Sequence, residues 1–265
     1  MSRTFDSDGV AIHYVEAGAG PPVVLVHSYA GDLRSQWVQT GVLDALARDY
    51  RAIAFDHRGH GESGKPHDPG AYGVRMTWDI ARLMDHLAIG RAHIVGYSMG
   101  AHLVAQLLTL APRRFLSATL GGGTGRRHWG DAEERQVEIE AGEMERGSLR
   151  AQVLRLWPEG KPPPRDEVIA RSSALFLRGK DCLALAASRR SNREQVFATE
   201  DLSGIDAPVL GIVGSEDPYL ASYDELRAVL PRIERVVIEG ADHAGAAGRK
   251  EFVEALLGFL KKTGV

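Results

Sequence analysis

Cysteine is nearly absent from the sequence, because Cys182 is the single one in 265 residues. A lone cysteine excludes an intrachain disulfide and leaves no cysteine cluster that could bind zinc. Long apolar runs are also missing, since none approaches the ~18 residues of a membrane-spanning helix. Residues 1–8 are polar and lack the apolar segment of a signal peptide. These absences predict a cytoplasmic protein.

An excess of basic residues is absent as well. The formal net charge is −3, and the sequence pI is about 6.4. Nucleic acids and anionic membranes are bound by clustered positive charge. We therefore expect neither of them as a partner.

Two patterns alternate along most of the chain. Short apolar stretches predict strands at 11–16, 23–27, 51–55, 92–95, 115–120, 209–213 and 235–238. Apolar residues at helical spacing predict helices at 36–49, 74–87, 101–110, 220–230 and 250–260. Strands that alternate with helices predict an α/β fold, with a mostly parallel central sheet that helices flank on both faces.

The alternation is interrupted in the middle of the chain. Residues 131–146 are dense in charge, three consecutive prolines follow at 162–164, and no apolar strand is recognisable before residue 198. We interpret residues 124–197 as a helical lid that is inserted into a core of residues 1–123 and 198–265. A plain run of surface helices is the alternative.

Ser98 stands at the centre of the pattern G-x-S-x-G, between Gly96 and Gly100. A predicted strand precedes the pattern and a predicted helix follows it. A sharp strand-to-helix turn that projects the serine outward crowds the backbone two residues before and after it, where glycine fits best. The first amides of the helix favour negative charge that develops beside the serine. The pattern therefore predicts a nucleophile.

A serine nucleophile needs a histidine as its base and a carboxylate that orients the histidine. His243 follows the last predicted strand, and Asp217 follows the strand at 209–213. In a parallel sheet, both positions lie at the edge where the strands end and where sites form. Glu216 and Asp242 are the competing carboxylates.

These residues resemble the α/β-hydrolase superfamily, specifically its lidded branch of serine esterases, carbon–carbon bond hydrolases and perhydrolases. The resemblance covers nearly the whole chain and is strongest at residues 27–31, the loop 56–63, the Ser98 turn, and the two loops that hold Asp217 and His243. It implies a Ser98–His243–Asp217 triad and an oxyanion hole formed by the backbone amides of Tyr29 and Met99. Ser28 stands where the family usually has glycine, which tolerates backbone angles that serine does not.

The resemblance implies a hydrolase that cleaves a small or medium carboxylic ester through an acyl-enzyme. We expect a small-molecule substrate, no cofactor or metal, and a monomer or homodimer. Alternatives with the same triad are a perhydrolase and a carbon–carbon bond hydrolase of the meta-cleavage type. A hydrolase-fold ligand receptor is a remote alternative. The carbon–carbon bond hydrolase needs a cation for the substrate carboxylate, for which the candidates are Arg126, Arg127, Arg189 and Arg190.

We predict substrate contacts for Tyr97, Trp129 and Trp157, with other large residues of the insertion as further candidates. Several polar residues near the predicted site have a structural interpretation instead. His27 orders the oxyanion loop, and we expect loop-shaping or packing roles for His57, His60, His93 and His102. Asp56, Arg58 and Glu62 show no metal-ligand spacing, and we interpret them as a network that braces their loop.

Overall fold

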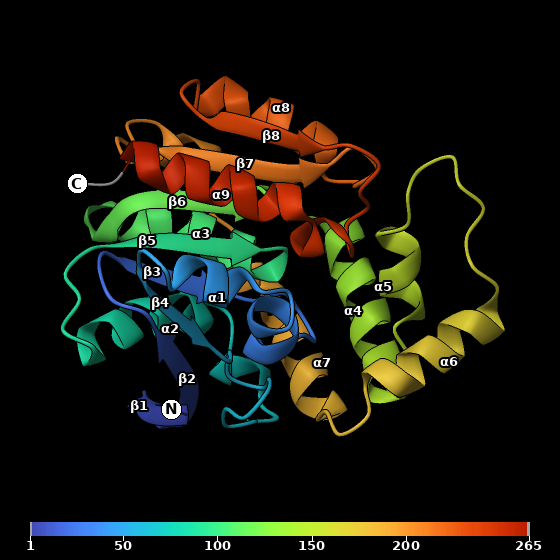
Figure 1. The fold of residues 1–265 in the computed structure, drawn as a ribbon. Helices are drawn as coiled ribbons and strands as arrows, with labels where there is room; N and C mark the ends of the chain where they lie inside the picture. The colour runs from blue at the N-terminus through green and yellow to red at the C-terminus, as the bar shows by residue number, and fades with distance from the viewer. Residues whose placement is uncertain (1, 264–265) are drawn as a thin grey trace.

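The computed structural model describes residues 2–263. Its strands are β1 (Ser2–Ser7), β2 (Val10–Ala17), β3 (Pro22–Val26), β4 (Arg51–Phe55), β5 (Ala92–Tyr97), β6 (Phe115–Gly121), β7 (Val209–Gly214) and β8 (Glu234–Ile238). They form one sheet in the order β1-β2-β4-β3-β5-β6-β7-β8 (Figure 1). Strands β3 to β8 pair in parallel, whereas β2 is antiparallel to both of its neighbours. The predicted α/β fold with a mostly parallel sheet is confirmed.

The helices lie on both faces of this sheet and at one end of it (Figure 1). They are α1 (Val42–Leu46), α2 (Val74–His86), α3 (Met99–Leu110), α4 (Asp131–Glu145), α5 (Arg150–Arg155), α6 (Asp166–Phe176), α7 (Cys182–Arg190), α8 (Leu220–Val229) and α9 (Lys250–Thr263). Short 3₁₀ turns occur at Pro69–Ala71, Pro112–Arg114, Ser191–Gln195, Thr199–Leu202 and Ala246–Gly248. No helix within residues 2–263 is long and apolar enough to cross a bilayer.

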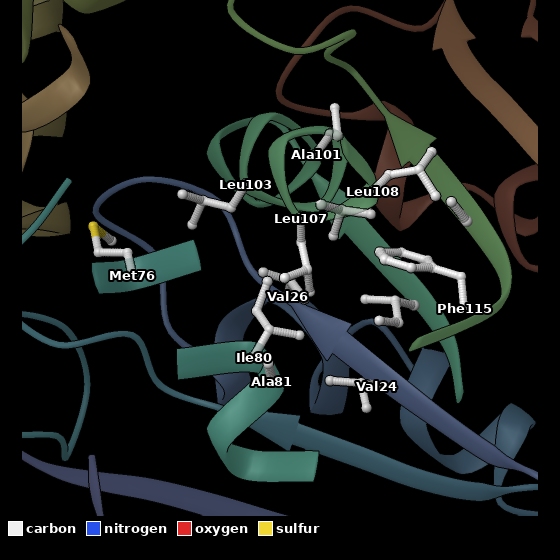
Figure 2. Close-up of a cluster of buried hydrophobic side chains, with 14 of the residues drawn as sticks. Val24, Val26, Met76, Ile80, Ala81, Ala101, Leu103, Leu107, Leu108 and Phe115 are labelled. Atoms are coloured by element: carbon white, nitrogen blue, oxygen red, sulfur yellow. The ribbon is translucent and has the colours of Figure 1, made fainter. Parts of the chain in front are cut away.

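The two sides of each central strand pack into different apolar layers. Val24 and Val26 of β3 lie in a layer with α2 and α3, where Ile80 and Leu107 are fully buried (Figure 2). Val23 and Leu25 of the same strand lie in the opposite layer, with α1 and α9. A strand that is buried on both sides has no polar alternation, which explains why these strands read as continuous apolar runs.

Strand β1 was not predicted because only one residue in it is apolar. Phe5 enters the core, while the residues beside it are polar and exposed. The strand forms through an Asp8-Gly9 turn, in which both residues have positive φ angles of 57° and 81°. This is the conformation of the tight turns that join antiparallel strands, and it pairs β1 with β2.

The single helix predicted at 36–49 is wrong. A π-helical turn at Arg34–Val38 and the short helix α1 take its place. Gly41 separates the two, because its φ of 76° is left-handed and ends the helical path. Apolar spacing continues through the break, so the sequence pattern alone does not reveal it.

Helices α4 to α7 all lie between β6 and β7, and no strand of the sheet comes from this segment. A single bridge, Arg126 to Val196, joins the two ends of the segment. In Figure 1, α4, α5 and α6 stand together beyond one end of the sheet. The segment 124–197, which we interpret as a lid, lies between β6 and β7 in the chain, and positions 1 and 264–265 of the proposed division lie outside the described residues.

Candidate active site

Ser98 occupies a strained turn between β5 and α3. Its φ of 53° and ψ of −113° lie outside the helical and extended regions. Neighbouring backbone leaves no room for side chains at the flanking glycines. A Cβ on Gly96 would lie 2.3 Å from the Gly100 carbonyl oxygen, and a Cβ on Gly100 would lie 2.0 Å from that of Val26. The two glycines therefore allow the turn that projects Ser98 from the sheet.

A chain of hydrogen bonds joins the three residues predicted as a triad. Ser98 Oγ lies 2.9 Å from His243 Nε2, and His243 Nδ1 lies 2.9 Å from Asp217 Oδ2. Because a carboxylate only accepts, Nδ1 carries the imidazole proton and Nε2 accepts from the serine hydroxyl. The loops after β5, β7 and β8 bring these residues from distant parts of the chain to the same edge of the sheet.

The two competing carboxylates point elsewhere. Glu216 forms an ion pair of 2.6 Å with Lys161, and Asp242 accepts a hydrogen bond from the backbone amide of Gly245. Asp217 is buried, and its second carboxylate oxygen accepts from the amide of Tyr219 at 2.9 Å. Of the three candidates, only Asp217 has its carboxylate against His243 within the described chain.

Tyr97, which we predicted to contact substrate, lies under the site. Its phenol donates a hydrogen bond of 2.6 Å to the backbone carbonyl oxygen of His243. Its ring packs against Phe252 and the His243 imidazole in the apolar layer of α9. The tyrosine therefore holds the loop of His243, and it does not line either of the two cavities described below.

The backbone amide of Tyr29 belongs to the loop after β3, and that of Met99 is the first amide of α3 and follows Ser98 directly. Within residues 2–263 neither amide donates to a protein acceptor. Ser28 has an ordinary negative φ, and the left-handed residue of this loop is Ala30, with φ of 56°. The serine hydroxyl donates to the side chain of Gln36 at 2.6 Å. Serine at position 28 is therefore compatible with this loop geometry.

Three buried histidines tie this loop to the loop 56–63. His27 Nδ1 donates to the Ser28 carbonyl oxygen at 2.8 Å, and His27 Nε2 accepts from the backbone amide of His57 at 3.0 Å. His57 Nε2 donates back to the His27 carbonyl oxygen. Burial lowers the pKa of His27, His57 and His60, the last to about 3, so the three rings are neutral. These contacts match the structural role that we expected.

Asp56 and Arg58 form the bracing network of the second loop. Asp56 accepts from the amides of Leu33 and Glu62 and from His13 Nδ1. Arg58 is buried in an ion pair with Asp79 at 2.6 Å. No group of side chains with the composition of a metal site occurs in the described part of the chain.

A cavity of about 470 Å³ lies between the core and helices α4, α5 and α7. We call it the arginine cavity. Its lining includes His102, Arg126, Trp129, Arg155, Arg189 and Tyr219. The Tyr219 ring lies 5.5 Å from the rings of both His243 and His102, and the His102 amide donates to the Ser98 carbonyl oxygen.

The predicted substrate residues of the insertion differ in position. Trp129 lines the arginine cavity, whereas Trp157 does not and donates its indole N–H to the carbonyl oxygen of Pro162. The sequence did not single out Tyr219 or Arg155, which carry no local motif. A second cavity of about 450 Å³ is lined by His60 and Lys180 among others. The three triad candidates are not among the lining residues of either of these two cavities.

Comparison with known proteins identifies the family. The model of the alpha/beta hydrolase fold family matches residues 21–156, about half of the chain. The chain therefore belongs to the α/β-hydrolase fold family, and it is an enzyme of the α/β-hydrolase type.

Individual proteins are also similar to this chain, and the solved structures among them share its fold. The dihydrolipoyllysine-residue acetyltransferase component of the acetoin cleaving system of Cupriavidus necator is 41% identical over 128 residues, which are 48% of this chain and 32% of that protein. This match therefore spans about a third of the relative's length. A carboxylesterase structure from Nitrososphaera gargenis has a TM-score of 0.80 at 22% identity, over 99% of this chain and 98% of that one. The enol-lactonase of Burkholderia xenovorans LB400 has a TM-score of 0.77 at 24% identity, over 98% and 100%.

Proposed function

We propose that this enzyme is a serine hydrolase that cleaves small or medium carboxylic esters through an acyl-enzyme. The observation that supports the proposal best is the hydrogen-bonded series from Asp217 through His243 to Ser98. Such a series, with the serine on a strained turn and the carboxylate buried, can generate a nucleophile at neutral pH. The similarity to a carboxylesterase and an enol-lactonase, both of which are named for ester cleavage, agrees with this proposal.

In the first step, His243 Nε2 takes the proton of Ser98 as Oγ attacks the ester carbonyl carbon. The carbonyl oxygen becomes an oxyanion that accepts hydrogen bonds from the amides of Tyr29 and Met99. His243 then gives its proton to the leaving alcohol oxygen, and the bond between acyl carbon and alcohol breaks. The acyl group remains on Ser98.

In the second step, a water molecule loses its proton to His243 and attacks the acyl carbon. The bond to Ser98 Oγ breaks, Oγ recovers the proton, and the carboxylic acid leaves. Asp217 keeps the imidazole in the tautomer that both steps need and stabilises its cationic form. No cofactor takes part in this scheme.

We propose further that residues 124–197 form a lid on the core of residues 1–123 and 198–265. The arginine cavity lies between these two parts, and the ring of its lining residue Tyr219 lies 5.5 Å from that of His243, which supports a role for Trp129 in substrate contact. The proposal for Trp157 has no support from the cavity lining. A small-molecule substrate in the cytoplasm and a monomeric or homodimeric enzyme complete the proposal.

The test is the hydrolysis of a series of p-nitrophenyl esters from acetyl to dodecanoyl, by the enzyme and by its Ser98→Ala variant. We expect turnover of the shorter esters and a loss of at least about 10⁴-fold in the variant, because the nucleophile is gone. Circular dichroism controls for folding of the variant. Comparable turnover by folded Ser98→Ala would remove Ser98 from the mechanism.

A further inference from the structure

The arginine cavity carries more positive charge than its carboxylates balance. Four guanidinium groups line the cavity, those of Arg126, Arg127, Arg155 and Arg189, together with the carboxylates of Glu133 and Glu225. Arg155 and Arg189 share one buried carboxylate, that of Glu140, which lies 2.6 Å from Arg155 Nε and 2.7 Å from Arg189 Nη2. Arg155 also donates to the phenol of Tyr219 at 3.1 Å.

Arg126 has no ionic partner. Within residues 2–263 no carboxylate oxygen lies within 4 Å of its guanidinium, and its Nε donates to the neutral amide oxygen of Gln195 at 3.2 Å. With its amide oxygen turned toward the guanidinium groups, Asn192 accepts from Arg189 Nη1 at 2.6 Å and from Arg126 Nη2 at 3.2 Å. Neutral acceptors thus orient Arg126 but leave its charge uncompensated.

The surrounding groups respond to this charge. Burial and the neighbouring Arg189 lower the pKa of Arg126. Burial raises the pKa of the Tyr219 phenol, but Arg155, Arg126 and Arg189 outweigh it, so that the pKa lies below its usual value. A buried charge without a counter-ion is costly for a folded protein, and an anion in the cavity would offset that cost.

The other two arginines that the sequence offered are already paired. Arg127 lies 3.2 Å from Glu225, and Arg190 bonds to Glu138 and Glu145. Arg127 lines the same cavity as Arg126, but both it and Arg190 have a carboxylate partner. Arg126 is half-buried and has no carboxylate partner within residues 2–263, and the cavity that it lines extends to Tyr219, whose ring lies 5.5 Å from that of His243.

We propose that the arginine cavity binds a carboxylate of the substrate, so that the preferred ester carries a free carboxylate besides the ester bond. This inference rests on the proposed ester hydrolysis at Ser98 and names its substrate class. Guanidinium groups bind carboxylates through paired, charge-assisted hydrogen bonds, and Arg126 and Arg189 offer such donors. Binding of the carboxylate there orients the scissile carbonyl toward Ser98, and uncharged esters lack this contact.

The carboxylate can belong to the acyl part or to the alcohol part of the ester, and matched substrates separate the two. For the acyl part, mono-p-nitrophenyl glutarate, adipate and pimelate are compared with the same compounds capped as methyl esters. For the alcohol part, 3-carboxyphenyl butanoate is compared with its methyl ester. In the wild-type enzyme we expect kcat/KM to favour a free carboxylate by about tenfold or more in one of the two sets.

The variant Arg126→Gln keeps a hydrogen-bond donor and removes the charge. We expect it to lower the ratio between the charged and the capped ester by about tenfold, mainly through KM. The matched control is Arg190→Gln, which removes the same charge from helix α7 outside the cavity lining and should leave the ratio as in the wild type. Equal kcat/KM for charged and capped esters in both sets, with Ser98-dependent turnover, would overturn the carboxylate site and leave the proposed function intact.

Binding measured without turnover tests the carboxylate site independently of the proposed ester hydrolysis at Ser98. Calorimetric titration of adipate and 3-hydroxybenzoate, against hexanoate and phenol as controls, needs no catalysis. If adipate binds more tightly than hexanoate, or 3-hydroxybenzoate more tightly than phenol, and Arg126→Gln removes the difference, the site is supported even if Ser98→Ala retains activity. If Arg126→Gln and Arg190→Gln weaken the binding of adipate equally, the binding reflects general attraction between opposite charges, and the site is overturned.

Discussion

Tyr97 donates a buried hydrogen bond of 2.6 Å to the backbone carbonyl oxygen of His243. The residue that precedes the proposed nucleophile in sequence therefore also fixes the loop of the proposed base. The contact spans most of the chain and lies in the same apolar layer as Phe252. It makes the Ser98–His243 distance depend on packing beneath the site as well as on the two loops.

Tyr97→Phe should lower kcat about three- to tenfold with little change in KM, because the variant frees the His243 loop without touching substrate. The buried carbonyl oxygen loses its donor, so the free energy of unfolding should fall by about 1–3 kcal/mol. Urea unfolding and p-nitrophenyl butanoate kinetics measure both. Tyr14→Phe, which removes a phenol bonded to His86, is the control and should lower stability without an effect on kcat. An unchanged kcat in Tyr97→Phe would show that the hydrogen bond does not position the base.

Asp217→Asn should reduce kcat by about 10⁴-fold, because an amide can hold the imidazole in the wrong tautomer, with the proton on Nε2. The matched control is Glu216→Gln, next to it in sequence, whose carboxylate pairs with Lys161 instead. We expect near wild-type kcat for the control. Steady-state kinetics with p-nitrophenyl butanoate compare the two variants. A larger loss in Glu216→Gln would assign the orienting role to Glu216.

Most of the sheet could be predicted because its strands are apolar, and the central strands β3 to β7 are buried on both sides. Strands β2 to β8 appear as apolar runs within a few residues of their observed bounds. Strand β1 could not be found, since its pairing depends on an Asp8-Gly9 turn and one apolar side chain. The helix predicted at 36–49 failed because a left-handed Gly41 breaks it while the apolar spacing continues.

Two of the residues that meet around Ser98 could be predicted, because the topology of the sheet determines their positions. Asp217 and His243 follow strands, so their approach to Ser98 follows from the sheet edge alone. The arginine cavity could not be predicted in the same way. Arg155 and Arg189 come together only because α5 and α7 pack around Glu140 of α4. Tryptophan size suggested Trp157, but size does not indicate which way a side chain faces.

Ala88→Gly should stabilise the protein by about 1 kcal/mol. Ala88 is exposed, follows the last turn of α2, and has a left-handed φ of 55°. The next amide, of Ile89, donates back to the Met84 carbonyl oxygen at 2.8 Å, a helix ending in which glycine is preferred. Ala170→Gly, at an exposed position inside α6, is the control and should cost about 1 kcal/mol. Equal loss of stability in both variants by urea unfolding would contradict the backbone argument.

His93 should make the protein less stable in acid. Its ring is buried in β5, where Nδ1 bonds to the Ser117 hydroxyl at 2.7 Å, and Nε2 has no partner within residues 2–263. Burial lowers the pKa of His93 to about 4, whereas an unfolded histidine titrates near pH 6.5. Between these values the unfolded chain binds a proton that the folded protein does not. The contribution of His93 to stability is therefore complete above about pH 6.5 and is lost progressively as the pH falls toward 4.

Removal of this histidine should flatten the pH dependence of unfolding. Glutamine does not titrate and can still bond to Ser117, so His93→Gln should reduce the slope of unfolding free energy against pH by up to about 1 kcal/mol per pH unit between pH 6.5 and 4.5. His27, His57, His60 and His102 are also buried with lowered pKa values, so a residual slope of the same sign should remain. His128→Gln, at an exposed position, should leave the slope as in the wild type. Urea titrations at pH 7.5, 6.0, 5.5 and 5.0 would decide the matter, since parallel curves for His93→Gln and wild type would mean that His93 titrates alike in the folded and unfolded protein.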